Sequence, residues 1–215
     1  INSAYKLSLL NDANSVNEFS VELKKIIKSL KKVNTIFSKM PEKCDPYVYY
    51  HRVRPYIFGT KDNPDLKEGL IYENQYQNAP QFFRGETGAQ SSIIPFLDGA
   101  LGIYHTNDNL RPYLNEMRDY MPPKHRKMIE NVEERSVAKE CIDKSKKLKL
   151  EYNQCLEEIR RFRAQHLEFA ASYIHKQSKA KNAFGSGGST FRGTGGTPFM
   201  RYLKKHRDET NKQKI

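Results

Sequence analysis

The chain has few of the residues that cross-link a protein or anchor it in a membrane. Its 215 residues include three cysteines and no tryptophan. Cys44, Cys141 and Cys155 are odd in number and far apart, which argues against a disulfide framework and indicates a reducing compartment. Because no C-x-x-C pair occurs, a cysteine-based zinc site is not predicted.

Long apolar runs are also missing. No stretch of 18 apolar residues occurs, so the sequence predicts no transmembrane helix and no membrane partner. The first residues do not form a charged start followed by an apolar core, so no signal peptide is predicted. We therefore expect a cytoplasmic protein. Only 37% of its residues are hydrophobic, and aromatic packing must rest on 13 tyrosines and 11 phenylalanines.

Acidic residues are too few to balance the basic ones, and the net charge is +12. Residues 141–215 carry 17 basic and 7 acidic side chains, and a basic segment could bind nucleic acid. However, these basic residues alternate with Glu151, Glu157 and Glu158 on the polar side of a helix, which is typical of a solvated face. Since no nucleic-acid-binding motif accompanies the charge, we expect no such partner. A basic nucleic-acid-binding or scaffold protein stays an alternative.

What the sequence does contain is helical periodicity. Strand signals are almost absent and no internal repeat is visible, so we predict an all-α helical bundle. Asp45 and Pro46 provide a cap and a first helical residue, and Pro55 should kink or restart that helix. Residues 59–85 are predicted to be loop. We expect helices over 17–40, 45–57, 88–105, 110–120, 124–141, 148–177 and 198–207.

The longest helical segment carries a histidine on its apolar side. His166 lies among residues that recur at three- and four-residue steps: Tyr152, Cys155, Leu156, Ile159, Phe162, Ala170, Tyr173 and Ile174. A polar ring in such a stripe must be hydrogen-bonded, ligated or neutral at a cost. Taken alone, the pattern fits a satisfied core histidine better than a metal or haem ligand.

Other polar residues also interrupt apolar surroundings. Arg54 follows Tyr50 by one helical turn, and a guanidinium on that side favours a carboxylate from the protein or from a ligand. The alternatives are an internal ion pair and an exposed arginine. Asp98 lies between apolar residues and needs a partner, which Arg163 could supply one turn before His166.

Two glycine-containing segments have both a structural and a functional interpretation. Residues 82–92 lead into a helix, where small side chains permit close approach of a flat ligand, although an ordinary helix cap also fits. Residues 185–197 lack the Gly-Lys-Ser/Thr of a phosphate-binding loop. We interpret them as a linker or as an active-site lid.

Five segments between residues 40 and 205, in order and with matching spacing, resemble the indoleamine 2,3-dioxygenase family. The form Gly-Glu-Thr-Gly-Ala-Gln-Ser-Ser in the second of them resembles the fungal branch. The five segments are Asp45-Pro-x-x-Tyr49-Tyr50-x-x-Val53-Arg54-Pro55, Arg84-Gly-Glu-Thr-Gly-Ala-Gln-Ser-Ser92, Met117-Arg-Asp-Tyr-Met-Pro-Pro-Lys-His-Arg126, Arg163-x-x-His166 and Gly193-Thr-Gly-Gly-Thr197.

The resemblance implies a haem b protein that inserts O2 into the indole ring of L-tryptophan and forms N-formylkynurenine, in the kynurenine pathway. His166 would be the proximal iron ligand, and the pair of Asp98 and Arg163 would orient its ring. Further residues against the haem would be Thr87, Gly88, Ala89 and Thr194.

The resemblance also implies a substrate site. Arg54 would pair with the carboxylate of tryptophan, and Tyr49 and Tyr50 would pack against its indole ring. The remaining substrate contacts would come from Thr87, Gly88 and Thr194. No residue is nominated as a general acid or base, because the cofactor carries out the oxygen chemistry.

The family has two domains, and the resemblance covers the large one. We expect residues 1–40 to form a connecting helix segment, and residues 41–215 to form the haem-binding large domain with a Gly-rich lid at 185–197. The small N-terminal domain of the family is expected to be absent, and a monomer is favoured. A haem- or O2-binding relative without catalysis is an alternative.

Overall fold

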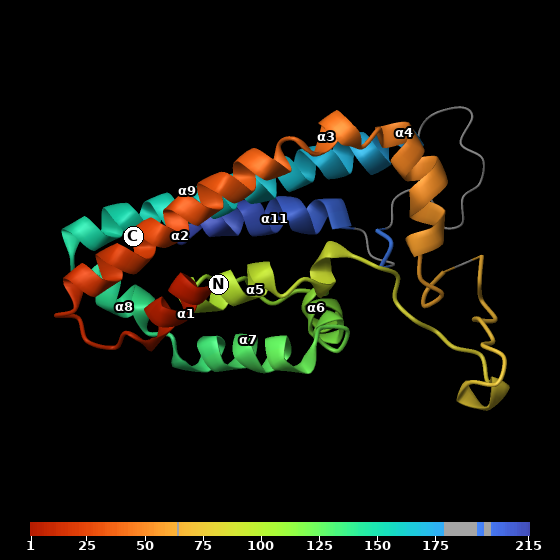
Figure 1. Ribbon diagram of the computed structural model, residues 1–215, viewed down its shortest axis with the longest axis horizontal. Helices are drawn as coiled ribbons and strands as arrows, with labels where there is room; N and C mark the ends of the chain where they lie inside the picture. Colours follow the sequence, from red (N-terminus) through yellow and green to blue (C-terminus); the bar gives the residue numbers. More distant parts are fainter. Residues whose placement is uncertain (64, 179–192, 196–198) are drawn as a thin grey trace. The chain divides into compact units, whose positions relative to one another are not determined.

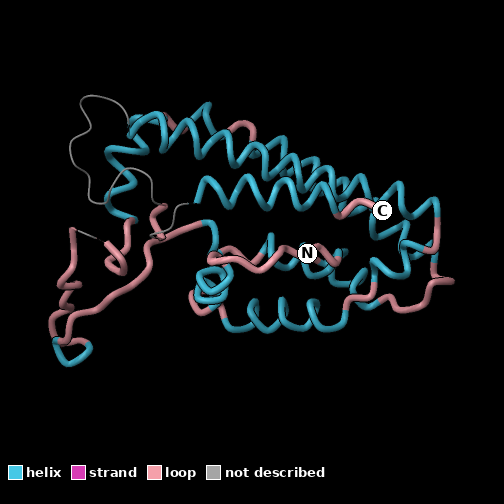
Figure 2. Tube along the Cα trace, turned by 180° about the vertical axis from the view of Figure 1, so that it is seen from behind, coloured by secondary structure: helices cyan, strands magenta, loops and turns pink. Residues whose placement is uncertain are grey.

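The computed structural model describes residues 1–63, 65–178, 193–195 and 199–215. These residues divide into two compact units, each considered by itself. Unit 1 comprises Ile1–Ser38, Ala89–Ala164 and Lys204–Ile215, and unit 2 comprises Lys39–Gly88 and Gln165–Leu203. Across the described residues, helices dominate and the extended pairing is one isolated bridge between Leu70 and Gln81 (Figure 2). The prediction of an all-α fold is confirmed.

Unit 1 is built from helices around a core of aliphatic and aromatic side chains. Its helices are α1 (Asn2–Leu9), α2 (Val16–Phe37), α5 (Ile93–Leu101), α6 (Arg111–Arg118), α7 (Pro123–Arg135), α8 (Ala138–Asp143), most of α9 (Lys146–Ala170) and most of α11 (Phe199–Lys212). Figure 1 shows α2 lying along α9, where Asn34 donates a 2.8 Å hydrogen bond to Glu158. The fully buried side chains include Phe19, Leu23, Phe96, Leu101, Ile129, Leu156 and Ile159.

The end of α5 is determined by a glycine. Gly102 has a φ of 64°, a left-handed conformation that glycine adopts without steric cost. The N–H of Ile103 then donates to the carbonyl of Asp98 at 2.8 Å. The chain that leaves this turn lies against α11, where the hydroxyl of Thr106 donates to Glu209 at 2.6 Å.

Unit 2 consists of short turns rather than long helices. Pro46 begins α4, and the carboxylate of Asp45 caps it by accepting from the N–H of Val48 at 2.9 Å. Pro55 restarts the helix as predicted, because proline has no N–H to donate. The elements are α3 (Met40–Lys43), α4 (Pro46–Val48), η1 (Tyr49–Val53), η2 (Arg54–Ile57), η3 (Tyr76–Asn78), η4 (Gly88–Gln90, whose last two residues belong to unit 1), the end of α9, η5 (Ala171–His175) and α10 (Lys176–Ser178).

Several predicted boundaries are wrong. The predicted helix 88–105 is a 3₁₀ turn followed by the nine residues of α5. The predicted helix 124–141 is two helices that are interrupted at Ser136 and Val137. The N-terminal helix α1 was not predicted, although Ala4 and Leu7 are fully buried in the core of unit 1. The long helix is α9, which ends at Ala170 and continues as the π-helical turn η5.

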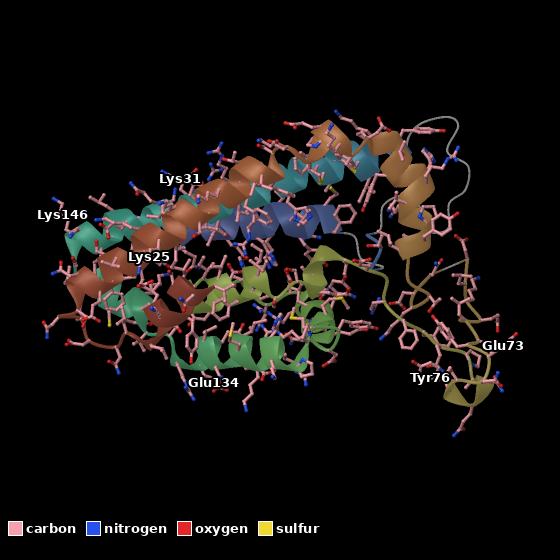
Figure 3. All side chains as sticks on the ribbon, viewed as in Figure 1. Lys25, Lys31, Glu73, Tyr76, Glu134 and Lys146 are labelled. Atoms are coloured by element: carbon pink, nitrogen blue, oxygen red, sulfur yellow. The ribbon has the colours of Figure 1, made fainter. Side chains whose placement is uncertain are left out.

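The basic charge of unit 1 lies largely on its surface. Lys31 on α2 and Lys146 at the start of α9 are exposed (Figure 3). Some cations are paired with nearby carboxylates, as in the 2.9 Å contact between Lys214 and Glu157. No helix in the described part of the chain is both long enough and apolar enough to cross a membrane.

Candidate functional site

The ten residues that the sequence nominates fall into both units. Ala89, Asp98 and Arg163 belong to unit 1. The others belong to unit 2, and they are Tyr49, Tyr50, Arg54, Thr87, Gly88, His166 and Thr194. Of the predicted lid, residues 185–192 and 196–197 lie outside the described residues. Residues 193–195 are described and contact the loop that follows Ile57.

His166 lies near the end of α9 and is partly buried. Burial lowers the pKa of its imidazole, because a low-dielectric environment disfavours the charged form of a histidine. The ring is therefore neutral at neutral pH and keeps a lone pair on one nitrogen. A neutral imidazole is the form that binds iron and other transition metals.

The predicted pairing of Asp98 with Arg163 is present in unit 1. The guanidinium Nη2 of Arg163 lies 2.5 Å from Oδ2 of Asp98, and the same guanidinium donates to the hydroxyl of Thr210. Burial raises the pKa of Asp98, but the charges and hydrogen bonds of Arg163 and His105 outweigh it, and the net shift is downward. Arg163 is thus held in place one helical turn before His166 on α9.

Arg54 is the most unusual residue of unit 2. Only 1% of its surface is exposed, which rules out the exposed arginine among the alternatives. Its guanidinium carbon lies 5.2 Å from the ring centroid of Tyr50 and 4.9 Å from that of Phe58. These are cation–π distances. Burial lowers its pKa, yet a guanidinium remains charged at neutral pH.

Two tyrosines, Tyr49 on η1 and Tyr173 on η5, connect these two elements of unit 2. The ring of Tyr49 packs edge-on against Tyr173, with 5.7 Å between centroids. The phenol of Tyr173 donates to the carbonyl of Cys44, and burial raises the pKa of both phenols. The sequence placed Tyr173 on the stripe of His166 but gave no sign of this contact, because the two tyrosines are far apart in the chain.

Thr194 is attached to unit 2 through closely spaced backbones. Its hydroxyl donates to the carbonyl of Glu86, and its carbonyl accepts from the N–H of Gly59 at 3.3 Å. A Cβ atom at Gly85 would lie 2.3 Å from the nitrogen of Gly59 and 2.4 Å from the carbonyl oxygen of Thr194. Gly59 and Gly85 are therefore required by packing, and sequence reasoning did not single out Gly59.

Gly88, unlike Gly59 and Gly85, is not closely surrounded by other atoms. A Cβ atom there would meet nothing within 4 Å, so the surrounding protein does not require a glycine. Thr87 beside it is partly buried. Gly88 is exposed, so the space beside it is open to solvent. The feature of unit 2 that fits a haem iron is the neutral imidazole of His166, because neutral imidazole is a common iron ligand.

Comparisons of the sequence with known proteins and protein families all lead to one family. The sequence profile described as "Indoleamine 2,3-dioxygenase" matches residues 3–213. Indoleamine 2,3-dioxygenase 1 of Rattus norvegicus is 37% identical in an alignment 196 residues long, which covers 87% of this chain and 48% of that protein. Indoleamine 2,3-dioxygenase of Saccharomyces cerevisiae is 30% identical over 219 residues, which cover 85% of this chain and 48% of the yeast protein.

One relative has a more specific name. The 6-hydroxytryptophan 2,3-dioxygenase of Fusarium equiseti is 32% identical in an alignment 215 residues long, which covers 92% of this chain and 52% of that protein. The chain therefore spans about half the length of the curated relatives that it matches.

Proposed function

Because the chain belongs to the indoleamine 2,3-dioxygenase family, we propose that it is the haem-binding part of an enzyme that inserts O2 into the indole ring of L-tryptophan. The product is N-formylkynurenine. Haem b supplies the iron at which O2 is activated. The protein supplies an axial ligand, a site that excludes water and a fixed orientation of the substrate.

His166 is the proposed axial ligand. Burial lowers the pKa of its imidazole, so the ring is in the neutral form that binds iron. Arg163 occupies the preceding turn of α9 and is fixed by Asp98 and Thr210. This anchoring limits rotation of the helix and thereby the positions that the ring of His166 can adopt.

Arg54 is the proposed substrate anchor, and it carries the proposal. Its guanidinium is buried, and its planar fork of N–H donors fits a carboxylate in two-point contact. The rings of Tyr50 and Phe58 flank it and limit the access of water.

The remaining residues are proposed to shape the pocket. Tyr49 and Tyr50 provide flat surfaces against which an indole can stack. Thr87, Gly88 and Ala89 are proposed to line the haem, with Gly88 leaving the space that a larger residue would fill. Thr194 is proposed to face the amine of the substrate and a haem propionate. Since no proton relay through a side chain is required, we assign no general acid or base.

The test is to follow the product with isotopically labelled oxygen. Haem-loaded full-length protein is reduced and mixed with L-tryptophan and ¹⁸O2, and the product is analysed by mass spectrometry. The proposal expects N-formylkynurenine that contains both labelled atoms. A protein that binds haem but gives no labelled product would instead be a non-catalytic haem- or O2-binding relative. A failure to bind haem would contradict the whole proposal.

A further inference from the structure

Unit 1 contains a cluster of two histidines and a glutamate that the proposed function does not use. His105 follows α5, while His206 and Glu209 lie on α11, which Figure 1 shows running beside α5. Nδ1 of His105 lies 2.8 Å from Oε2 of Glu209. The imidazole rings of His105 and His206 are stacked, with 4.1 Å between centroids and 20° between planes.

The three side chains are a recognised type of metal-ligand set. Within the described residues, they are the only group of three or more His, Cys, Asp or Glu residues in which one donor atom of each lies within 4.8 Å of the others. His206 and Glu209 are three residues apart on one helix, so they share a face. Two imidazoles and one carboxylate match the chemistry of zinc and similar divalent ions.

Charged neighbours complete the environment. Nε2 of His105 lies 3.4 Å from Oδ2 of Asp98, which resembles the carboxylate–histidine–metal arrangement that fixes a ligand's tautomer. The nearby cations are occupied by other carboxylates, since Arg163 pairs with Asp98 and Lys205 pairs with Asp108. Lys205 is also 3.7 Å from Oε1 of Glu209, on the oxygen that does not contact His105.

We propose that His105, His206 and Glu209 bind a divalent transition-metal ion of the zinc class, and that this ion fastens α11 to the segment that follows α5. Ligand atoms on one zinc ion lie roughly 3–3.5 Å apart, because each bond is about 2 Å long. The contact between His105 and Glu209 is already slightly shorter than this spacing. The donor atoms of the three residues lie within 4.8 Å of one another, and binding would require the side chain of His206 to turn out of its stacked arrangement with His105 so that both rings direct a nitrogen at the ion. A water molecule would occupy the fourth position.

The experiment uses haem-free protein of the complete 215-residue chain, so that its outcome does not depend on the proposed dioxygenase function. Zinc chloride is titrated by calorimetry, and one ion per chain is expected. The variants His206→Gln and Glu209→Gln should each weaken zinc binding at least tenfold. His125→Gln is the matched control, because His125 is exposed and lies outside the cluster. His166→Ala should bind zinc as the parent does.

Two further measurements keep the test decisive if a variant is unstable. Zinc should raise the melting temperature of the parent protein and of His125→Gln, but not that of Glu209→Gln. Cobalt(II), added to the parent protein, should give the visible absorption of a tetrahedral nitrogen–oxygen site without a sulfur charge-transfer band. Absence of zinc binding, a sulfur band, or loss of binding in His166→Ala would each overturn the proposal.

Discussion

The interiors of the two units differ in the kind of residue that fills them. Unit 1 buries aliphatic and aromatic side chains from nearly all of its helices, as in a conventional core. In the described part of unit 2, the buried hydrophobic residues are Tyr50, Ala170 and Tyr173. Its other buried side chains are polar and include Arg54 and Thr194. Unit 1 thus has the interior of a structural core, whereas the interior of unit 2 is mostly polar, and unit 2 holds most of the residues of the proposed site.

The two units also differ in the surroundings of their buried arginines, Arg163 in unit 1 and Arg54 in unit 2. The contacts of Arg163 are a carboxylate and a hydroxyl of the chain, Asp98 and Thr210. The contacts of Arg54 include two aromatic rings. The ion pair of Arg163 with Asp98 contributes to the fold, whereas the cation–π contacts of Arg54 accompany its proposed role as the substrate anchor. We therefore expect the two arginines to respond differently to substitution.

The largest expected effect is on the cofactor. His166→Ala should abolish stable haem binding, because no other side chain on that face of α9 can provide an axial nitrogen. His125→Ala should bind haem like the parent, since this exposed histidine makes its contact with Ser92. Both are measured from the Soret absorption during haem titration. An unchanged Soret band in His166→Ala would show that another residue holds the iron.

The next effect concerns the ion pair of unit 1. Asp98→Asn leaves the guanidinium of Arg163 without its carboxylate and should lower the free energy of unfolding by about 3 kcal/mol. The control is Asp119→Asn, which removes an exposed partner of Arg126 and should cost less than about 1 kcal/mol. Urea denaturation in the presence of a chelator measures both. Equal losses would mean that the pair of Asp98 and Arg163 is not a buried structural contact.

Unit 1 should also respond to mild acid. The pKa of His206 is lowered from its ordinary value of 6.5 to about 4, so between these values the unfolded chain binds a proton that the folded chain does not. Its contribution to stability is therefore present above pH 6.5 and falls as the pH decreases towards 4. The total change is at most about 3.5 kcal/mol, because one pKa unit corresponds to about 1.4 kcal/mol.

The control for this pH dependence is a pair of histidine variants. His206→Gln should flatten the stability profile between pH 6.5 and 4, while His125→Gln should leave it unchanged. Urea denaturation across this range, with a chelator present, measures the slope. If the two variants gave the same slope as the parent, burial of His206 would not control the acid sensitivity of unit 1.

The smallest expected effect is a loss of tryptophan affinity on substitution of Arg54, which the neighbouring Arg52 should not share. Arg54→Lys should cost at least about 2 kcal/mol of tryptophan affinity, because an ammonium lacks the two-point fork of a guanidinium. Arg52→Lys is the matched control, since Arg52 is exposed and two residues away. Affinities are obtained from tryptophan titrations of the haem-loaded full-length protein. A lysine variant that bound tryptophan as tightly as the parent would remove Arg54 from the substrate site.

The sequence predicted those elements whose signals are local. Apolar periodicity identified α2 and α9, and Asp45 with Pro46 predicted the start of α4. Helix α1 was missed because eight residues give little periodicity and the helix depends on the burial of Ala4 and Leu7. The interruption near Ser136 contains no glycine or proline. There the hydroxyl of Ser136 donates to the carbonyl of Ala100 at 2.9 Å, a tertiary contact that no local pattern reveals.

In the candidate site, too, the sequence could not reveal contacts between residues that are far apart in the chain. The need of Asp98 for Arg163 could be predicted, because both stand among apolar residues on helices. The cluster of His105, His206 and Glu209 could not be predicted, since about 100 residues separate the first from the others. Gly59 and Gly85 also could not be interpreted before their backbones were seen to approach each other and Thr194.

The most direct test of the central claim, that Arg54 recognises the substrate carboxylate, is a double-mutant cycle with the ligand as one partner. L-tryptophan and tryptamine, which lacks the carboxylate, are titrated into haem-loaded parent protein and into Arg54→Leu. The account predicts that the parent prefers tryptophan by at least about 2 kcal/mol and that this preference disappears in the variant. If Arg54→Leu kept the full preference for tryptophan, the carboxylate would be bound elsewhere and the claim would be wrong.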